Sequence, residues 1–236
     1  MHAVTRRLAD VVIAVAVALA ILAVAILPFL NSGYVAFAQG RAEATAWTGF
    51  SEAELRVVTD AILADLIVGP PDFDVAVDGE PVLNGRERSH MRDVRTVFMG
   101  FFALAVLAGL AAIVIATRRR DAEARTHTWS AVRMGSLVLA VSLVALGGVA
   151  LVAFDVLFEI FHQLLFAGGS YTFDPATERL VQLFPFQFWQ ETAIAVGVVA
   201  VVLGLLVAYL ASRRGAAAAA EAEARTHAPA AIAGPA

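Results

Sequence analysis

The sequence contains no cysteine, which excludes disulfides, thiol catalysis and metal sites built on cysteine. It also lacks lysine: every basic residue is an arginine, and no basic patch with interleaved aromatic residues points to a nucleic-acid partner. Charged residues make up only 16% of the chain, whereas hydrophobic residues make up 60%, above the roughly 45–50% of an ordinary soluble domain. This composition indicates a membrane protein.

Four apolar runs are each long enough to cross a bilayer, which takes about 20 residues. Charged residues lie only near the ends of these runs, and the first run carries one acid, Asp10. Buried helices of a soluble protein are a poor alternative, because too few polar residues remain to cover four such helices. The predicted spans are residues 8–30, 94–117, 134–154 and 192–211.

The first run also has features of a secretory signal peptide. Arg6 and Arg7 precede it, and Ala36-Phe37-Ala38 follows it in the A-x-A pattern of a cleavage site. Its apolar stretch, however, is about twice the length of a signal-peptide core. We therefore expect an uncleaved first span.

Arginines gather before the first run, between the second and third runs, and after the fourth. The positive-inside rule then places both termini in the cytoplasm and the loops 31–93 and 155–191 outside. We predict an all-α membrane protein of the bacterial cell membrane with four transmembrane helices. Its membrane domain covers residues 1–215, and the alanine-rich residues 216–236 are expected to be a disordered cytoplasmic tail.

The first outer loop has local structure signals of its own. Ser51 and Glu54 fit the S-x-x-E capping box that begins a helix, and Gly69-Pro70-Pro71 ends it. Alternating valines around Asp78-Gly79 predict a short hairpin. The loop is therefore expected to form a small extracytoplasmic cap of one helix and a short hairpin.

Two stripes of ionisable side chains flank the second and third apolar runs at their outer ends. Spacings of three and four residues place the members of each stripe on one face of a helix. Ionisable side chains close to a membrane are costly and usually face a polar interior. Each stripe contains Glu-x-x-His, and the two stripes are Glu87, His90 and Asp93, and Asp155, Glu159 and His162.

The residues alone leave several explanations of the stripes open. The alternatives are a hydrogen-bonded seam between helices, an acid/base site based on histidine, a di-metal site of the paired Glu-x-x-His kind, and a proton path. Conduction usually requires such groups deep in the spans, and a di-metal site usually lies in a bundle core. The apolar segment 180–189 before the last run is similarly typical of an aromatic belt or of a groove for lipid access.

Two longer motifs carry a family resemblance. The run ERSHMRDVRTVF at 87–98 resembles an E-x-x-H-x-x-D-V-x-x-x-F signature. The run FEIFHQLLFAGGSYTFDPATERLVQLFPFQFW at 158–189 resembles an F-H-x-x-x-F, W-x-F-D-P and F-P-x-x-F-W signature, with Tyr171 where an indole is more usual. Both signatures occur in a family of four-span bacterial membrane proteins that includes the lipoprotein intramolecular transacylases.

The resemblance implies an intramolecular acyl transfer. The sn-2 acyl chain of a diacylglyceryl-cysteine lipoprotein moves to the α-amine of the same cysteine, which yields a lyso-form lipoprotein. The implied partner is a diacylated lipoprotein or membrane lipid, and the reaction needs no metal and no cofactor. The motifs place the functional histidines at His90 and His162, with supporting roles for Glu87, Asp93, Asp155 and Glu159.

We expect the two imidazoles to lie within about 10 Å of each other at one depth, with Glu159 or Asp155 near one of them. Because Glu87 and Asp93 flank His90, His90 is expected to accept the proton of the amine, and His162 to stabilise the oxyanion or protonate the leaving oxygen. The reverse division stays open, since the sequence does not specify tautomers. The alternative is a non-catalytic membrane protein whose stripes are structural or bind a lipid or partner.

Overall fold

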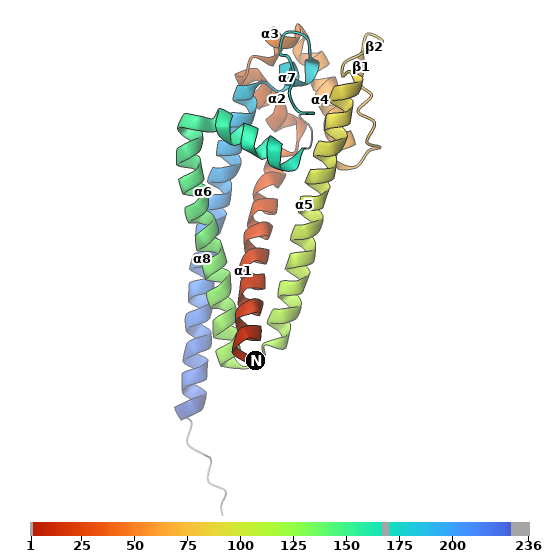
Figure 1. The fold of residues 1–236 in the computed structure, drawn as a ribbon. Helices are drawn as coiled ribbons and strands as arrows, with labels where there is room; N and C mark the ends of the chain where they lie inside the picture. Colours follow the sequence, from red (N-terminus) through yellow and green to blue (C-terminus); the bar gives the residue numbers. More distant parts are fainter. Residues whose placement is uncertain (1, 167–169, 228–236) are drawn as a thin grey trace, which may run out of the picture. The chain divides into compact units, whose positions relative to one another are not determined.

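The computed structural model describes residues 2–166 and 170–227, so residues 228–236 of the expected tail lie outside the described part of the chain. The described chain is almost entirely helical. Its elements are α1 (His2–Ile26), η1 (Leu27–Phe29), α2 (Ser32–Arg41), α3 (Ala44–Thr48), α4 (Glu52–Ile67), β1 (Ala76–Val77), β2 (Glu80–Pro81), α5 (Gly85–Arg118), α6 (Ala122–Leu165), α7 (Arg179–Leu183) and α8 (Phe186–His227) (Figure 1).

Four of the described helices, α1, α5, α6 and α8, are long and apolar enough to cross a membrane. Helices α5, α6 and α8 each contain one of the apolar runs predicted to span the bilayer, and α1 with η1 covers the first run up to Phe29, so the four-helix prediction is confirmed. The chain divides into two compact units. One contains the residues up to Ile21, Ala105–Ser142 and the residues from Val201, and the other contains Leu22–Leu104 and Leu143–Ala200.

In the first unit, the helices approach each other through small residues. A Cβ atom added at Gly135 of α6 would lie 2.3 Å from the carbonyl oxygen of Ala14 in α1. A Cβ at Gly204 of α8 would lie 3.2 Å from the carbonyl oxygen of Ser136. Small residues are typical of transmembrane interfaces, because close packing of helices replaces the hydrophobic driving force that acts in water.

The acid in the first span has a cationic partner in the same unit. Arg119, which lies between α5 and α6, donates from Nη1 to Oδ1 of Asp10 over 2.7 Å. Its Nη2 also donates to the backbone carbonyl of Arg6. An acid in an apolar helix is costly unless it is paired, so this contact explains how α1 tolerates Asp10.

The C-terminal segment differs from the sequence-based expectation. Helix α8 continues to His227, into the residues 216–236 that were expected to be disordered. Alanine has the highest helix propensity of all residues, so an alanine-rich segment extends a helix that is already nucleated. Arg125 of α6 also forms an ion pair with Glu221 within this segment.

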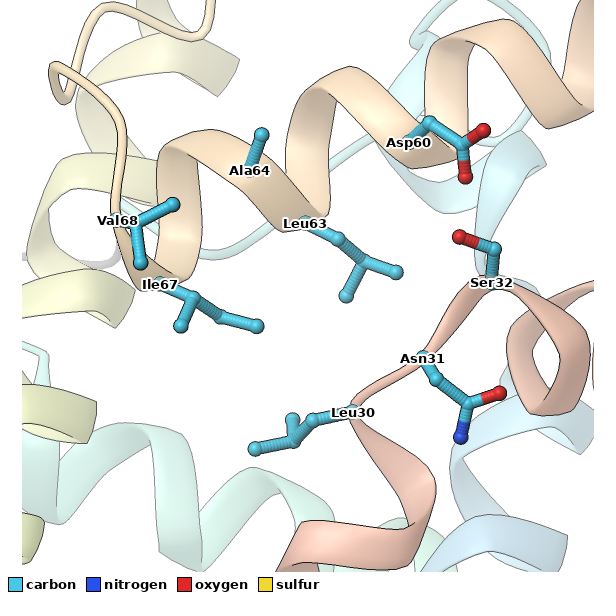
Figure 2. A pocket seen from close by; sticks show the side chains of 8 residues that line it. All are labelled: Leu30, Asn31, Ser32, Asp60, Leu63, Ala64, Ile67 and Val68. Carbon is cyan, nitrogen blue, oxygen red and sulfur yellow. The ribbon is translucent and has the colours of Figure 1, made fainter.

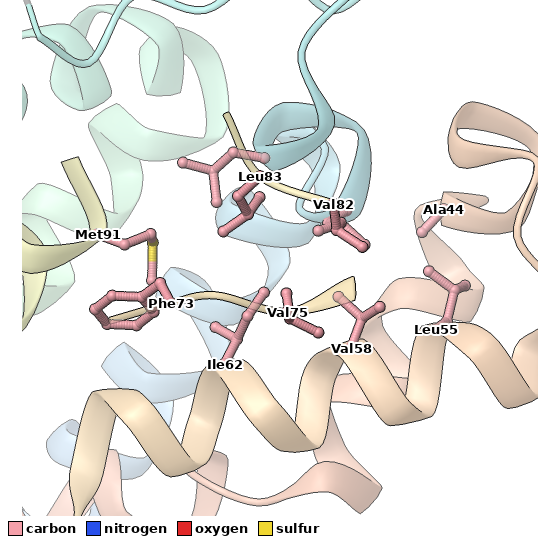
Figure 3. Packing of buried hydrophobic residues seen from close by; sticks show 11 residues of the cluster. Ala44, Leu55, Val58, Ile62, Phe73, Val75, Val82, Leu83 and Met91 are labelled. Carbon is pink, nitrogen blue, oxygen red and sulfur yellow. The ribbon is translucent and has the colours of Figure 1, made fainter. Parts of the chain in front are cut away.

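The second unit contains the small helices of the predicted cap, which Figure 1 shows grouped near the first turns of α5. The capping box is present: the Ser51 hydroxyl accepts from the Glu54 backbone N–H, and the Glu54 carboxylate accepts from the Ser51 N–H. One face of α4 packs with the hairpin segment, α7 and one residue of α5. Figure 3 shows this apolar core, whose members are Ala44, Leu55, Val58, Ile62, Phe73, Val75, Val82, Leu83, Met91, Leu180 and Leu183.

Residues 68–84, which connect α4 to α5, form a hairpin and are bound by arginines of α5. β1 and β2 pair antiparallel across the Asp78-Gly79 turn, where both residues adopt positive φ, as a two-residue hairpin turn requires. Arginines of α5 bind the preceding loop: Arg95 donates to the carbonyls of Asp65 and Gly69, and Arg88 donates to the carbonyl of Asp72. These contacts join the start of α5 to the end of α4.

Helix α6 is interrupted at Ala153, whose φ of −145° and ψ of 43° are not helical. The last segment, residues 154–165, bends away from the turns before it in Figure 1. Asp155, Glu159 and His162 share one face of this segment, and the exposed apolar residues of the other faces include Val156, Ile160, Phe161, Leu164 and Leu165. An amphipathic segment that follows a membrane span is typical of a helix at the lipid–water interface.

Candidate active site

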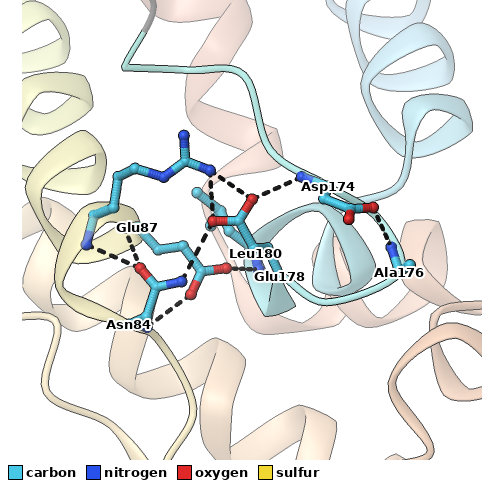
Figure 4. Close-up of polar contacts among 7 residues, drawn as sticks. Asn84, Glu87, Asp174, Ala176, Glu178 and Leu180 are labelled. Atoms are coloured by element: carbon cyan, nitrogen blue, oxygen red, sulfur yellow. Dashed lines mark hydrogen bonds and ion pairs between the residues drawn. The ribbon is translucent and has the colours of Figure 1, made fainter.

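The first turn of α5 is stabilised by a second, reciprocal cap. The Asn84 side-chain oxygen accepts from the backbone N–H groups of Arg86 and Glu87, and Oε2 of Glu87 accepts from the Asn84 N–H over 2.7 Å. The other carboxylate oxygen of Glu87 accepts from the Leu180 N–H at 2.6 Å, in the first turn of α7. Figure 4 shows Glu87 between these partners. The side chain is 1% exposed and ties α5 to α7.

One turn further along α5, His90 lies in an aromatic environment. Its ring centroid is 4.9 Å from that of Phe166 and 5.4 Å from that of Phe173. His90 is 5% exposed, and its Nδ1 atom has no hydrogen-bond partner among the described residues. Burial among apolar rings favours the uncharged form of an imidazole.

His162 lies in the bent segment of α6 and is 8% exposed. Its Nδ1 atom is 2.7 Å from the backbone carbonyl oxygen of Phe158. A carbonyl oxygen only accepts hydrogen bonds, so Nδ1 carries the proton and, in the neutral ring, Nε2 carries the lone pair. The rings of Phe158, Phe166 and Tyr171 pack around His162 at centroid distances of 4.1, 5.4 and 5.0 Å.

The two imidazoles lie side by side. Their ring centroids are 6.1 Å apart and their planes differ by 24°, with Phe166 in contact with both rings. The prediction that the two imidazoles lie within about 10 Å of each other is therefore confirmed. The residues involved come from α5 and from the bent segment of α6, which are far apart in the sequence but belong to the same compact unit.

The carboxylates of the stripes take different positions. Both oxygens of Glu87 are occupied by backbone N–H groups, and Asp93 is exposed, so Glu87 does not orient His90 as the sequence led us to expect. Asp155 is exposed and makes no side-chain hydrogen bond to the described residues. Glu159 accepts from the hydroxyl of Tyr171 over 2.8 Å, and this hydrogen bond raises the pKa of Tyr171. Because the Tyr171 ring also packs against His162, Glu159 lies near this histidine, as expected.

Two residues beside the histidines were missed by the sequence reasoning. Nη2 of Arg86 lies 2.6 Å from both carboxylate oxygens of Glu178, and Glu178 also accepts from the Asp174 N–H at 2.7 Å (Figure 4). Burial alone would raise the pKa of Glu178, but hydrogen bonds from Arg86, from the Asp174 backbone and from Asn84 lower it below its ordinary value. The sequence signal that could have identified this pair is the acid Glu178, which lies just before the apolar segment 180–189.

Two further features lie in the described part of the chain. No group of three or more His, Asp or Glu side chains there is arranged to hold a metal ion. A pocket of about 320 Å³ opens between α4 and the start of α2, and neither histidine lines it. Figure 2 shows its lining residues, Leu30, Asn31, Ser32, Asp60, Leu63, Ala64, Ile67 and Val68.

Comparison with known proteins decides the family. The family model described as "Lipoprotein intramolecular transacylase Lit" matches residues 11–189, which is more than half of the chain. The chain belongs to the Lit family. The match includes both Glu-x-x-His stripes and ends at Trp189, so it contains every residue of the histidine cluster described above.

Solved Lit structures share the fold of this chain. The membrane integral lipoprotein intramolecular transacylase Lit from Bacillus cereus is 17% identical, with a TM-score of 0.72 over 92% of this chain and 98% of that chain. Variants of the same protein with one histidine replaced by arginine or by alanine match with TM-scores of 0.67 and 0.65, at 17% and 18% identity, over 93% and 90% of this chain and 96% and 94% of theirs. No curated protein matches the sequence.

Proposed function

We propose that this protein is an intramolecular transacylase of the Lit type, which moves the sn-2 acyl chain of a diacylglyceryl-cysteine lipoprotein to the α-amine of that cysteine. Membership of the Lit family supports the general reaction. The observation that carries the proposal for this chain is the stacked pair His90 and His162, enclosed by aromatic rings and with the Nδ1 proton of one ring held on a backbone carbonyl.

The reaction is an isomerisation of one substrate. The amine nitrogen forms a bond to the ester carbonyl carbon, the bond from that carbon to the glyceryl oxygen breaks, and one proton moves from nitrogen to oxygen. An α-amine has a pKa of about 7.7–8.0, so it must be deprotonated to attack. Attack within one molecule gains an effective molarity of up to about 10⁵–10⁸ M when the reacting groups are well oriented. The reaction therefore requires positioning and proton transfer rather than an enzyme nucleophile.

The tautomer of His162 supports a division of roles that is the reverse of the one expected from the sequence. With Nδ1–H bound to the Phe158 carbonyl, the neutral ring presents Nε2 as a proton acceptor. His162 then takes the proton of the amine and returns it to the leaving glyceryl oxygen. His90, whose Nδ1 atom makes no hydrogen bond to described residues, donates to the carbonyl oxygen as negative charge develops there.

The aromatic rings around the pair fit this chemistry. Phe158, Phe166, Phe173 and Tyr171 pack against the imidazoles, which are 5% and 8% exposed, and an apolar surrounding disfavours water, which would compete with the amine for the ester. A low-dielectric surrounding also strengthens a hydrogen bond to a developing oxyanion. A site with these properties suits a substrate whose acyl chains remain in the membrane.

The orientation of the chain is part of the proposal. The arginines at 118–120 and 213–214 place these segments in the cytoplasm, and the histidine pair then lies at the outer membrane face, where lipoproteins are anchored. Reporter fusions after Arg120 and Arg214 are expected to report a cytoplasmic location, and a fusion at Asp74 an external one. A cytoplasmic signal at Asp74 would place the pair on the wrong side of the membrane for this substrate.

The function is tested by mass spectrometry of a lipoprotein. Cells that produce this protein are expected to yield N-terminal lipopeptides in which an acyl chain has moved from the glyceryl group to the amine, with no change in total mass. Tandem fragmentation separates the two isomers. Cells without the gene provide the control. If the lipopeptides of the two strains are identical, the alternative of a non-catalytic protein that binds lipid or a partner replaces the proposal.

A further inference from the structure

The acyl transfer proposed above assigns no role to the ion pair of Arg86 and Glu178. Glu178 also accepts hydrogen bonds from Asn84 and from the Asp174 N–H. The Arg86 guanidinium contacts both oxygens of Glu178, and its Cζ atom lies 4.8 Å from the centroid of the Phe173 ring. Glu178 is 9% exposed, whereas the Arg86 side chain is half exposed. The Arg86 guanidinium therefore lies over the Phe173 ring and is also partly exposed to solvent.

Phe173 connects this pair to His90. The Phe173 and His90 rings pack in a T-shaped arrangement at a centroid distance of 5.4 Å. The next residue, Asp174, donates its backbone N–H to Glu178, and the side chain of Asn84 also contacts Glu178 (Figure 4). The turn that carries Phe173 is thus attached to the first turn of α5, one helical turn from His90.

From these contacts we infer that Arg86 and Glu178 are positioning residues, which hold the Phe173 ring against His90 and so fix the orientation of that imidazole. The inference rests on the proposed function for its effect on turnover, although the geometry it describes does not. Packing orients the ring, because Phe166 and Phe173 contact it and its Nδ1 atom makes no hydrogen bond to the described residues. A catalytic group displaced by about 1 Å loses about 10²-fold in rate.

A merely structural ion pair is the competing explanation, and the chain offers a matched control. Arg41 of α2 and Glu191 of α8 also form a two-point ion pair, with distances of 2.5 and 2.9 Å. In the described part of the chain, the side chains of Arg41 and Glu191 make no hydrogen bond or cation–π contact with the rings that surround the histidines. Loss of this second pair removes a contact of the same chemistry without touching the site.

The first measurement is the reactivity of His90, which needs no turnover. In Glu178→Gln, the rate at which diethyl pyrocarbonate modifies His90, followed by peptide mass spectrometry, should rise at least about fivefold over the wild type. Glu191→Gln should leave that rate unchanged. Phe173→Leu, which keeps the ion pair and removes the ring, should also expose His90, and Phe173→Tyr should restore the protection. Equal His90 reactivity in all variants would overturn the inference.

The second measurement is kinetic. Glu178→Gln and Arg86→Gln should lower kcat for lyso-form production by about 10–100-fold with little change in KM, whereas Glu191→Gln should keep the wild-type kcat. Rate losses in both pairs that follow the melting temperature would assign Arg86 and Glu178 a structural role only. The wild type could also form no lyso-form product while Glu178→Gln raises the rate at which diethyl pyrocarbonate modifies His90. That result would refute the proposed function and retain the positioning role.

Discussion

Replacing either His90 or His162 with alanine is expected to reduce lyso-form production by about 10²–10⁴-fold, the usual contribution of a general acid or base. In the proposed mechanism His162 accepts the proton of the amine at Nε2, because its Nδ1 proton is held by the Phe158 carbonyl. His90 lies beside it with a centroid distance of 6.1 Å and an unpaired, buried Nδ1 atom. Product is measured by fragmentation of the lipoprotein N-terminal peptide.

The controls separate catalysis from structure and from metal chemistry. His127→Ala removes a partly exposed histidine at the other end of α6 and should leave product formation unchanged. Amounts of folded His90→Ala and His162→Ala should match the wild type in detergent extracts, since a structural seam would instead lower abundance and keep any product. A chelator should not slow the wild type, and loss of activity on chelation would contradict proton transfer by the imidazoles alone.

The largest expected effect on stability is that of Glu87→Ala. The carboxylate accepts from the backbone N–H groups of Asn84 and Leu180 and Glu87 is 1% exposed, so alanine leaves the buried Leu180 donor unpaired and removes the reciprocal cap at Asn84. The unsatisfied buried donor costs about 1–3 kcal/mol and the lost cap about 0.5–2 kcal/mol, which together is about 2–5 kcal/mol. At about 2–4 °C per kcal/mol for a chain of this size, the melting temperature should fall by about 5–20 °C.

The comparison variant is Glu87→Gln, whose side-chain oxygen accepts one of the two hydrogen bonds. It should show a smaller loss of melting temperature, and the exposed Glu52→Ala should show little change. Thermal unfolding in detergent micelles, followed by circular dichroism, measures all three. A Glu87→Ala protein as stable as the wild type but inactive would give Glu87 the direct role beside His90 that the sequence suggested.

Several structural features could be read directly from the sequence because they depend on neighbours along the chain. The four spans follow from apolar runs of sufficient length, and α4 begins at the Ser51–Glu54 capping box. The hairpin turn follows from Asp78-Gly79, since this pair adopts positive φ at low cost. The proximity of His90 and His162 followed from matched stripes at the ends of successive spans, a pattern that limits where the two helix faces can meet.

The sequence failed to predict side-chain contacts whose partner lies far away in the chain or is a backbone group, and it also failed to predict the length of α8. Helical spacing showed that Glu87 shares a face with His90, yet it contained no information on the Leu180 N–H that binds the carboxylate. The contact between Arg86 and Glu178 depends on the return of the loop before α7 to α5. The extension of α8 to His227 shows that alanine-rich sequence in continuity with a helix is itself helical.

The sequence by itself determined the four-helix membrane architecture, because hydrophobic length is a property of a single chain segment, and its motifs indicated the family. The tertiary structure alone decided the chemistry of the site. It enclosed both rings in aromatic side chains and bound the Glu87 carboxylate to backbone N–H groups rather than to an imidazole. The contact of His162 Nδ1 with the Phe158 carbonyl needs only one turn of α6, whereas the burial of the rings and the Leu180 partner of Glu87 depend on atoms brought together from separate elements.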